Sequence, residues 1–70
     1  MSDNIQIQLN GKQKSVRASF SISELLVELE IAHPAVAVEI NQQIQPRNEF
    51  ASTKLKDGDV VEVVSLVGGG

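Results

Sequence analysis

The chain has 70 residues, a net charge of −3 and no cysteine, which fits one small globular domain. The absence of cysteine excludes a disulfide, a zinc–thiolate site, an iron–sulfur cluster and a thiol nucleophile. The excess of acidic residues, and the lack of a basic stripe with interleaved aromatic residues, argue against binding to nucleic acid.

Residues 1–4 lack the basic and apolar stretches of a signal peptide, and no apolar run approaches the ~20 residues of a membrane span, so we expect a cytoplasmic protein that binds no membrane.

The chain opens with a predicted β-hairpin. Ile5, Ile7 and Leu9 alternate with glutamines, as in a half-buried strand. Asn10-Gly11 then supplies the strongest short signal for a hairpin turn, and the alternation resumes on a return strand.

A helix follows the hairpin. Ser21 and Glu24 have the spacing of a capping box, in which each side chain bonds the backbone N–H of the other residue. Apolar residues then recur on one helical face, at Ile22, Leu25, Leu26 and Leu29. Because proline disfavours helix at the residue before it, we expect a helix over residues 22–30 that ends before Pro34.

The next predicted elements are two strands joined by a tight turn. Residues 36–40 alternate between apolar and other side chains, as in a strand. Asn41-Gln42 is predicted to form the turn, since asparagine accepts left-handed backbone geometry. Pro46 cannot donate a ladder hydrogen bond, which limits the following strand to residues 43–45.

The last third of the chain holds a long connection and a final strand. Residues 47–56 form an irregular connection, with Phe50 and Leu55 as its anchors in the core. Residues 56–59 form a turn, and the apolar run of residues 60–67 is typical of a central strand covered on at least one face.

This order of elements predicts an α+β protein with the β-grasp, or ubiquitin-like, architecture. The apolar stripe of the helix must pack across the sheet, because no other surface can cover it. The last strand then lies beside the first in a mixed sheet of four to five strands packed on one helix. We assign residues 1–67 to this domain and residues 68–70 to a flexible C-terminal glycine tail.

The side chains offer little chemistry for an enzyme. His33 is the sole histidine, and without cysteine it is a poor metal candidate. No serine lies in a nucleophile elbow, so no catalytic triad is indicated. The neighbouring carboxylates have structural explanations, in the helix for Glu24 and Glu28 and in the turn for Asp57 and Asp59. We therefore expect no catalytic residue, no metal and no cofactor bound by this chain.

The chain ends on Gly68, Gly69 and Gly70, so its last group is a carboxylate on a tether without side chains. Such a tail can enter a channel too narrow for other residues, and three extended glycines reach roughly 10 Å. The alternative is a frayed terminus. A carboxylate becomes a good electrophile when it is coupled to AMP, and a partner enzyme would have to supply the nucleotide site and metal for that step.

Residues 35–47 (AVAVEINQQIQPR) contain a strand–Asn–strand–Pro-Arg pattern, and residues 56–64 (KDGDVVEVV) contain a turn and the final strand. Both segments resemble the ThiS family, the sulfur carrier proteins of thiamin biosynthesis. The hairpin, the capped helix and the terminal glycines also fit, so the resemblance spans the whole chain. One departure is the turn Asn41-Gln42, where the family has Asn-Gly, and it bears on the turn rather than on the chemistry.

The resemblance implies a carrier that partner enzymes act on, rather than an enzyme. A ubiquitin-activating-enzyme-like adenylyltransferase, using ATP and Mg, would adenylate the Gly70 carboxylate, with Gly68 and Gly69 threading the tail into its site. Sulfur taken from cysteine by a cysteine desulfurase, or from another donor system, would convert the adenylate to a thiocarboxylate. Thiazole synthase would then use that sulfur for the thiazole ring of thiamin.

Three alternatives remain open. The small subunit of molybdopterin synthase shares the terminal chemistry, but prolines typically precede its tail where this chain has Ser65-Leu66-Val67. A ubiquitin-like protein modifier would join its terminal carboxylate to lysines. A β-grasp interaction module would leave its tail inert.

Val64 and Leu66 share strand parity with Glu62, and we expect them to line an exposed apolar docking face. The helix covers one face of the sheet, and apolar surface left open often marks a partner site. The alternative is that the connection of residues 47–56 buries both side chains.

Overall fold

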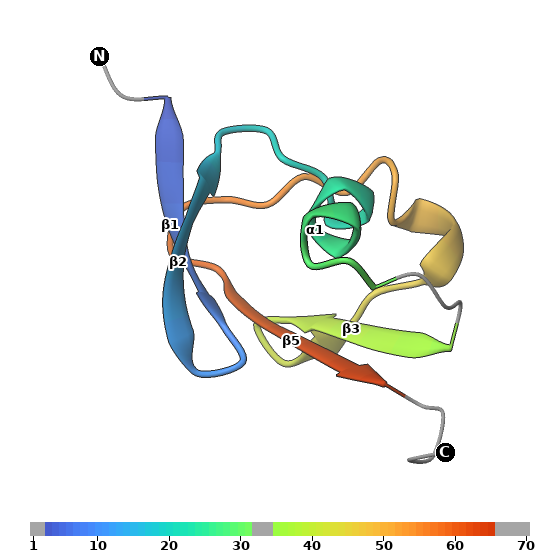
Figure 1. The fold of residues 1–70 in the computed structure, drawn as a ribbon. Coiled ribbons are helices and arrows are strands. Elements are labelled where there is room, and N and C mark those ends of the chain that lie inside the picture. The colour runs from blue at the N-terminus through green and yellow to red at the C-terminus, as the bar shows by residue number, and fades with distance from the viewer. Residues whose placement is uncertain (1–2, 32–34, 66–70) are drawn as a thin grey trace.

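The structure is a computed structural model that describes residues 3–31 and 35–65 (Figure 1). The elements in chain order are β1 (Asn4–Leu9), β2 (Lys12–Arg17), α1 (Ile22–Glu28), β3 (Val36–Ile40), β4 (Gln43–Ile44), the short 3-10 helix η1 (Arg47–Glu49) and β5 (Val60–Ser65). The predicted order of strands and helix is confirmed, and η1 is an addition within the connection that was expected to be irregular. His33 lies outside the described residues.

The five strands form one mixed sheet in the order β2-β1-β5-β3-β4. β5 pairs in parallel with β1 and antiparallel with β3, so the last strand lies in the middle of the sheet, as expected. This is the β-grasp architecture that the sequence predicted. The described part thus has five strands, the upper limit of the four to five that were predicted, and β4 is the shortest at two residues.

Two tight turns close the hairpins on either side of β5. Asn10 and Gly11 have φ values of 50° and 84°, and Asn41 and Gln42 have values of 53° and 69°. Positive φ at both central residues matches the twist of the flanking strands in two-residue hairpins. Both predicted turns are confirmed, and Gln42 adopts a left-handed geometry that glycine takes with less strain.

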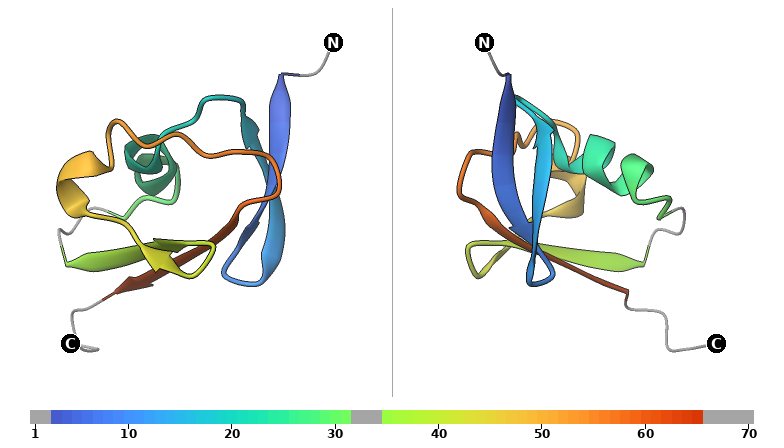
Figure 2. Two further views of the ribbon diagram at one scale, coloured as in Figure 1. Left: turned by 180° about the vertical axis from the view of Figure 1, so that it is seen from behind. Right: turned by 60° about the vertical axis from the view of Figure 1, so that its left-hand side comes forward.

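The core lies between the sheet and α1, which covers one face of the sheet (Figures 1 and 2). Its buried apolar side chains are Ile7, Val16, Phe20, Ile22, Leu25, Val36, Val38, Ile40, Phe50, Leu55 and Val61. Phe50 and Leu55 belong to the connection between β4 and β5, so this connection packs on the helix side of the sheet. Their predicted role as anchors is confirmed.

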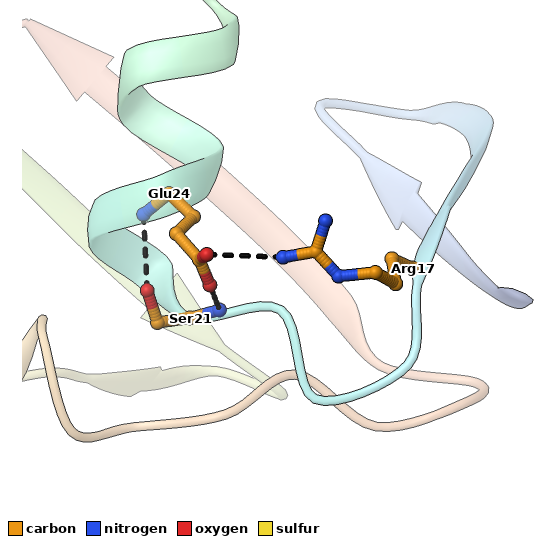
Figure 3. A network of polar contacts seen from close by, with 3 residues as sticks. All are labelled: Arg17, Ser21 and Glu24. Atoms are coloured by element: carbon orange, nitrogen blue, oxygen red, sulfur yellow. Dashed lines mark hydrogen bonds and ion pairs between the residues drawn. The ribbon is translucent and has the colours of Figure 1, made fainter. Parts of the chain in front are cut away.

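The N-terminus of α1 is held by the capping box that the sequence predicted (Figure 3). The backbone N–H of Glu24 donates to the Ser21 Oγ at 3.0 Å, and the Ser21 N–H donates to the Glu24 Oε1 at 2.8 Å. The Glu24 Oε2 also pairs with the Arg17 Nη2 at 3.1 Å. The cap therefore links the helix to the end of β2.

The connection between η1 and β5 satisfies the remaining donors at this helix end. The Ile22 N–H donates to the Thr53 carbonyl at 3.1 Å, and the Ser23 N–H donates to the Phe50 carbonyl at 3.0 Å. Since the first backbone N–H groups of a helix have no partner within the helix, these bonds replace water. They fix the connection against α1 and keep it away from the opposite face of the sheet.

The helix ends two residues earlier than the predicted range of residues 22–30. The N–H of Ile31 donates to the Leu26 carbonyl and the N–H of Glu30 donates to the Val27 carbonyl, both at 3.0 Å. These are the two bonds of a Schellman motif, in which the residue after the cap is left-handed. Here that residue is Glu30, with φ of 60°, so the predicted end was wrong because no glycine marks it.

Candidate functional site

The strand β5 is the element that leads toward the terminal glycines. It lies between β1 and β3 in the sheet, and Ser65 is its last residue (Figure 1). Five residues follow Ser65 in the sequence and end at Gly70. The predicted site residues Gly68, Gly69 and Gly70 lie outside the described residues, as does the predicted boundary after residue 67, so their roles stay predictions.

The turn residue Asn10 holds one edge of β5 with its side chain. Its Oδ1 accepts from the Val63 N–H at 2.9 Å, and its Nδ2 donates to the Val63 carbonyl at 3.3 Å. The paired register between β1 and β5 covers Gln8 with Val60 and Leu9 with Val61. The Asn10 backbone N–H donates to the Val61 carbonyl at 2.9 Å, and the Asn10 side-chain amide continues the ladder from there to Val63.

Asn41 holds the start of β5 from the other side. Its Oδ1 accepts from the Val60 N–H at 2.9 Å, and its Nδ2 donates to the Asp59 Oδ1 at 3.1 Å. Asp59 is buried, and its Oδ2 accepts from the Lys56 N–H at 2.8 Å. These bonds fix the turn before β5, and hence the direction in which the strand leaves it.

The side chains of Asn10 and Asn41 were missed as positioning residues by sequence reasoning, which assigned them to turns alone. Their partners on β5 lie 53 and 19 residues further along the chain. A turn signal is local, and it says nothing about which distant strand the amide will meet.

The face of the sheet opposite α1 carries exposed apolar side chains. Val64 is 50% exposed, so the alternative that the connection of residues 47–56 buries it is wrong. That connection packs on the helix side, through Phe50 and Leu55. Leu66 lies outside the described residues, and the docking role of Val64 and Leu66 stays a prediction.

The carboxylates that could have formed catalytic pairs have structural partners. Glu28 pairs with Lys14 at 2.6 Å, which ties α1 to β2. Asp57 accepts the Gln6 N–H at 2.8 Å, and Asp59 holds the turn before β5. Within residues 3–31 and 35–65 there is no group of three or more histidine, aspartate or glutamate side chains placed to hold a metal ion.

A shallow groove of about 380 Å³ lies beside the helix cap, lined by Arg17, Phe20, Ser23, Glu24, Val27 and Glu28. Its charged groups are already engaged in the ion pairs of Glu24 with Arg17 and of Glu28 with Lys14.

Among the described residues, no helix has both the length and the apolar character that a membrane span requires.

The environment of Glu24 favours its charged form. The hydrogen bond from the Ser21 backbone N–H lowers the pKa of Glu24 most, with smaller contributions from the Ser21 hydroxyl and from the positive charges of Arg17 and Lys54. Desolvation opposes this shift but does not outweigh it. The perturbed carboxyl group therefore belongs to the helix cap and marks no catalytic site.

These observations define a β-grasp protein whose central last strand, clamped by two turn asparagines, leads into a glycine-ended segment. A family model described as "ThiS family" matches residues 7–70, and the chain belongs to that family. The predicted family, the sulfur carriers of thiamin biosynthesis, is thus confirmed.

Individual proteins agree with this assignment. The protein of Bacillus subtilis named "Sulfur carrier protein ThiS" is 37% identical over 65 residues, which cover 91% of this chain and 98% of that protein. The crystal structure of the thiamine biosynthesis protein ThiS from Geobacter metallireducens superposes with a TM-score of 0.80 at 38% identity, covering 94% of this chain and all of that chain.

A third kind of relative is a longer protein. A protein of Paramagnetospirillum magneticum named "Thiazole synthase" is 36% identical over 66 residues, which cover 94% of this chain. The chain spans a fifth of the length of that protein, and a fifth of the thiazole synthase of Magnetococcus marinus. A ThiS-like segment is therefore part of some proteins that bear the name thiazole synthase.

Proposed function

We propose that this chain is a sulfur carrier of thiamin biosynthesis and that its reactive group is the Gly70 carboxylate. The observation that carries the proposal is the match of the ThiS family model through residue 70, on a fold of the same kind as a solved ThiS structure. The clamped strand β5 supports it, since a rigid strand before a short glycine tether limits where the carboxylate can lie. The chain itself acts as a carrier and supplies no catalytic side chain.

The proposed chemistry proceeds in two steps on a partner enzyme. The Gly70 carboxylate attacks the α-phosphate of ATP, which forms an acyl adenylate and releases pyrophosphate. A sulfur nucleophile at the oxidation level of hydrosulfide then attacks the carbonyl carbon, and AMP leaves with one of the original carboxylate oxygens. The product is a thiocarboxylate, in which one oxygen has been replaced by sulfur.

The partners follow from these steps. A ubiquitin-activating-enzyme-like adenylyltransferase would bind ATP and Mg, whose charge stabilises the phosphates in the transition state. A cysteine desulfurase or another donor system would supply the sulfur, and a thiol reductant would bring the persulfide sulfur of the desulfurase to the hydrosulfide level by a two-electron reduction. Thiazole synthase would consume the thiocarboxylate, and the ThiS-like segments within proteins named thiazole synthase support this pairing. We place the carrier in the cytoplasm, where ATP and cysteine are available.

Intact-mass spectrometry tests the proposal. The chain is coexpressed with an adenylyltransferase and a cysteine desulfurase, and its mass should rise by the difference between a sulfur and an oxygen atom. The same chain expressed alone is the control, and its mass also establishes that Gly70 is the terminal residue.

Other outcomes separate the alternatives. Isopeptide adducts on lysines would identify a protein modifier, and an unchanged mass would indicate an inert module. If the thiocarboxylate forms but supports sulfur transfer to the large subunit of molybdopterin synthase instead of to thiazole synthase, the thiamin assignment is wrong.

A further inference from the structure

The face of the sheet that α1 leaves open combines apolar and acidic side chains. Val61 points into the core, so Val60, Glu62 and Val64 alternate onto the opposite face of β5. On the neighbouring strand, Glu39 alternates with the buried Val38 and Ile40 and shares that face. We call Ala37, Glu39, Ile44, Val60, Glu62 and Val64 the open face.

Three of the four exposed large apolar side chains in the described residues lie on the open face. Ile44 is 72% exposed, Val64 is 50% exposed and Val60 is 42% exposed. Ile44 pairs with Glu39 across β3 and β4, and Val64 pairs with Ala37 across β3 and β5, so Ile44 and Val64 lie on the two strands that flank β3. Apolar surface gathered in this way is a typical mark of a protein-binding site.

Two carboxylates face each other at the centre of this surface. Glu39 and Glu62 are direct partners in the antiparallel register of β3 and β5. Side chains at such positions start roughly 4.5–5.5 Å apart at Cβ, and like charges there destabilise a sheet. Within residues 3–31 and 35–65 neither carboxylate forms an ion pair with a basic side chain.

The length of the remaining chain sets where a partner must lie. Five residues separate Ser65 from the Gly70 carboxylate, and fully extended they span about 16–18 Å. An enzyme that encloses this carboxylate must therefore contact the body close to the end of β5. The open face is the exposed apolar surface on that strand, because α1 and the connection to β5 occupy the other face.

We propose that the open face docks the enzyme that adenylates Gly70 and that Glu39 and Glu62 together hold an arginine side chain of that enzyme. The proposal rests on the proposed function of the carrier. A guanidinium group carries several N–H donors in one plane and can bond two carboxylates at once. Its charge relieves the repulsion between Glu39 and Glu62, while Ile44 and Val64 contact the apolar surroundings of the arginine.

The test measures stability and binding for Glu39→Gln and Glu62→Gln. Each substitution removes the like-charge opposition and should raise the melting temperature of the isolated carrier. Each should also raise the Kd for the adenylyltransferase about tenfold, as expected when one partner of an interfacial charge pair is lost. The Kd should then depend less on salt concentration.

Control variants separate a local effect from a general one. Glu49→Gln makes the same change in net charge at an exposed position on η1, outside the open face, and should leave the Kd unchanged. Val64→Ser removes exposed apolar surface and should weaken binding without unfolding the carrier, which far-UV circular dichroism checks.

The outcomes are distinguishable. Wild-type affinity in both glutamate variants, with adenylation intact, would overturn the docking proposal and leave the proposed function standing. A loss of affinity for thiazole synthase with unchanged affinity for the adenylyltransferase would overturn the choice of partner. If wild-type carrier is not adenylated at all, the proposed function fails and the docking proposal fails with it.

Discussion

Glu24 connects three parts of the molecule through one side chain. Its carboxylate accepts the Ser21 N–H at the start of α1 and pairs with Arg17 at the end of β2 (Figure 3). The Arg17 guanidinium carbon in turn lies 5.2 Å from the centre of the Phe20 ring, in a cation–π arrangement. A residue whose sequence context indicates a helix cap therefore also ties the hairpin to the helix.

Replacing Glu24 with glutamine should lower stability at neutral pH and reduce its sensitivity to acid. Glutamine can still bond back to the Ser21 N–H, but it carries no charge and does not titrate. The Ser21 backbone N–H, as the largest cause, lowers the pKa of Glu24 in the folded protein. The resulting stability is present above the unfolded pKa of about 4.3 and is lost as the pH falls through the lowered value.

Urea unfolding at a series of pH values measures this effect. The chain has no tryptophan or tyrosine, so far-UV circular dichroism is the suitable signal. The difference in unfolding free energy between native protein and Glu24→Gln should be largest at neutral pH and should close in acid. A difference that stays constant with pH would show that the charge of Glu24 contributes nothing to the cap.

At the scale of elements, local sequence signals were sufficient to predict every strand and the start of the helix. The alternation in residues 5–9 and 36–40 and the spacing of Ser21 and Glu24 each lie within a few residues. The end of α1 could not be predicted, because Glu30 occupies the left-handed position where glycine is usual. The short helix η1 likewise carries no strong periodic signal.

The candidate site likewise combines features that the local sequence predicts with features that it does not. The terminal glycines stand out in the sequence because they lack side chains. The bonds from Asn10 and Asn41 to β5, and the opposition of Glu39 and Glu62, depend on strand register, which brings together residues far apart in the chain. The pattern within a strand indicates which of its faces is buried and so constrains the register, but it does not identify the distant strand with which it pairs.

Glu30→Gly should stabilise the protein by about 1 kcal/mol, because glycine removes the strain of a left-handed residue with a Cβ atom. For a domain of this size, that gain corresponds to a rise in melting temperature of roughly 4–8 °C. Thermal unfolding followed by circular dichroism measures it.

Glu30→Ala is the matched control for Glu30→Gly. It removes the same charge but keeps the Cβ atom, so it should give no comparable gain. Equal stabilisation by both variants would assign the effect to charge and would contradict the conformational explanation.

At the scale of the whole molecule, the packed core and the proposed reactive group lie in different parts of the chain. The buried apolar residues of the described part run from Ile7 to Val61, and the turn bonds from Asn10 and Asn41 end at Val63. The proposed reactive group comes after them, at Gly70. A carrier built in this way can change its terminus through an enzymatic cycle while its core stays the same.

Removing residues 68–70 should therefore abolish adenylation while changing the unfolding free energy by less than about 0.5 kcal/mol. The shortened chain ends on Val67, whose branched side chain cannot enter a narrow channel as glycine can.

Deleting a single glycine is the companion variant, since the chain still ends on two glycines but reaches about 3.3–3.6 Å less far. A large loss of adenylation in that variant would show that reach limits the reaction, because small displacements of a reacting group cost large factors in rate. ATP–pyrophosphate exchange with the adenylyltransferase measures adenylation, and urea unfolding measures the unfolding free energy. Exchange at the wild-type rate without residues 68–70 would refute the role of the terminal glycines, and a marked loss of stability would show that these residues pack against the domain.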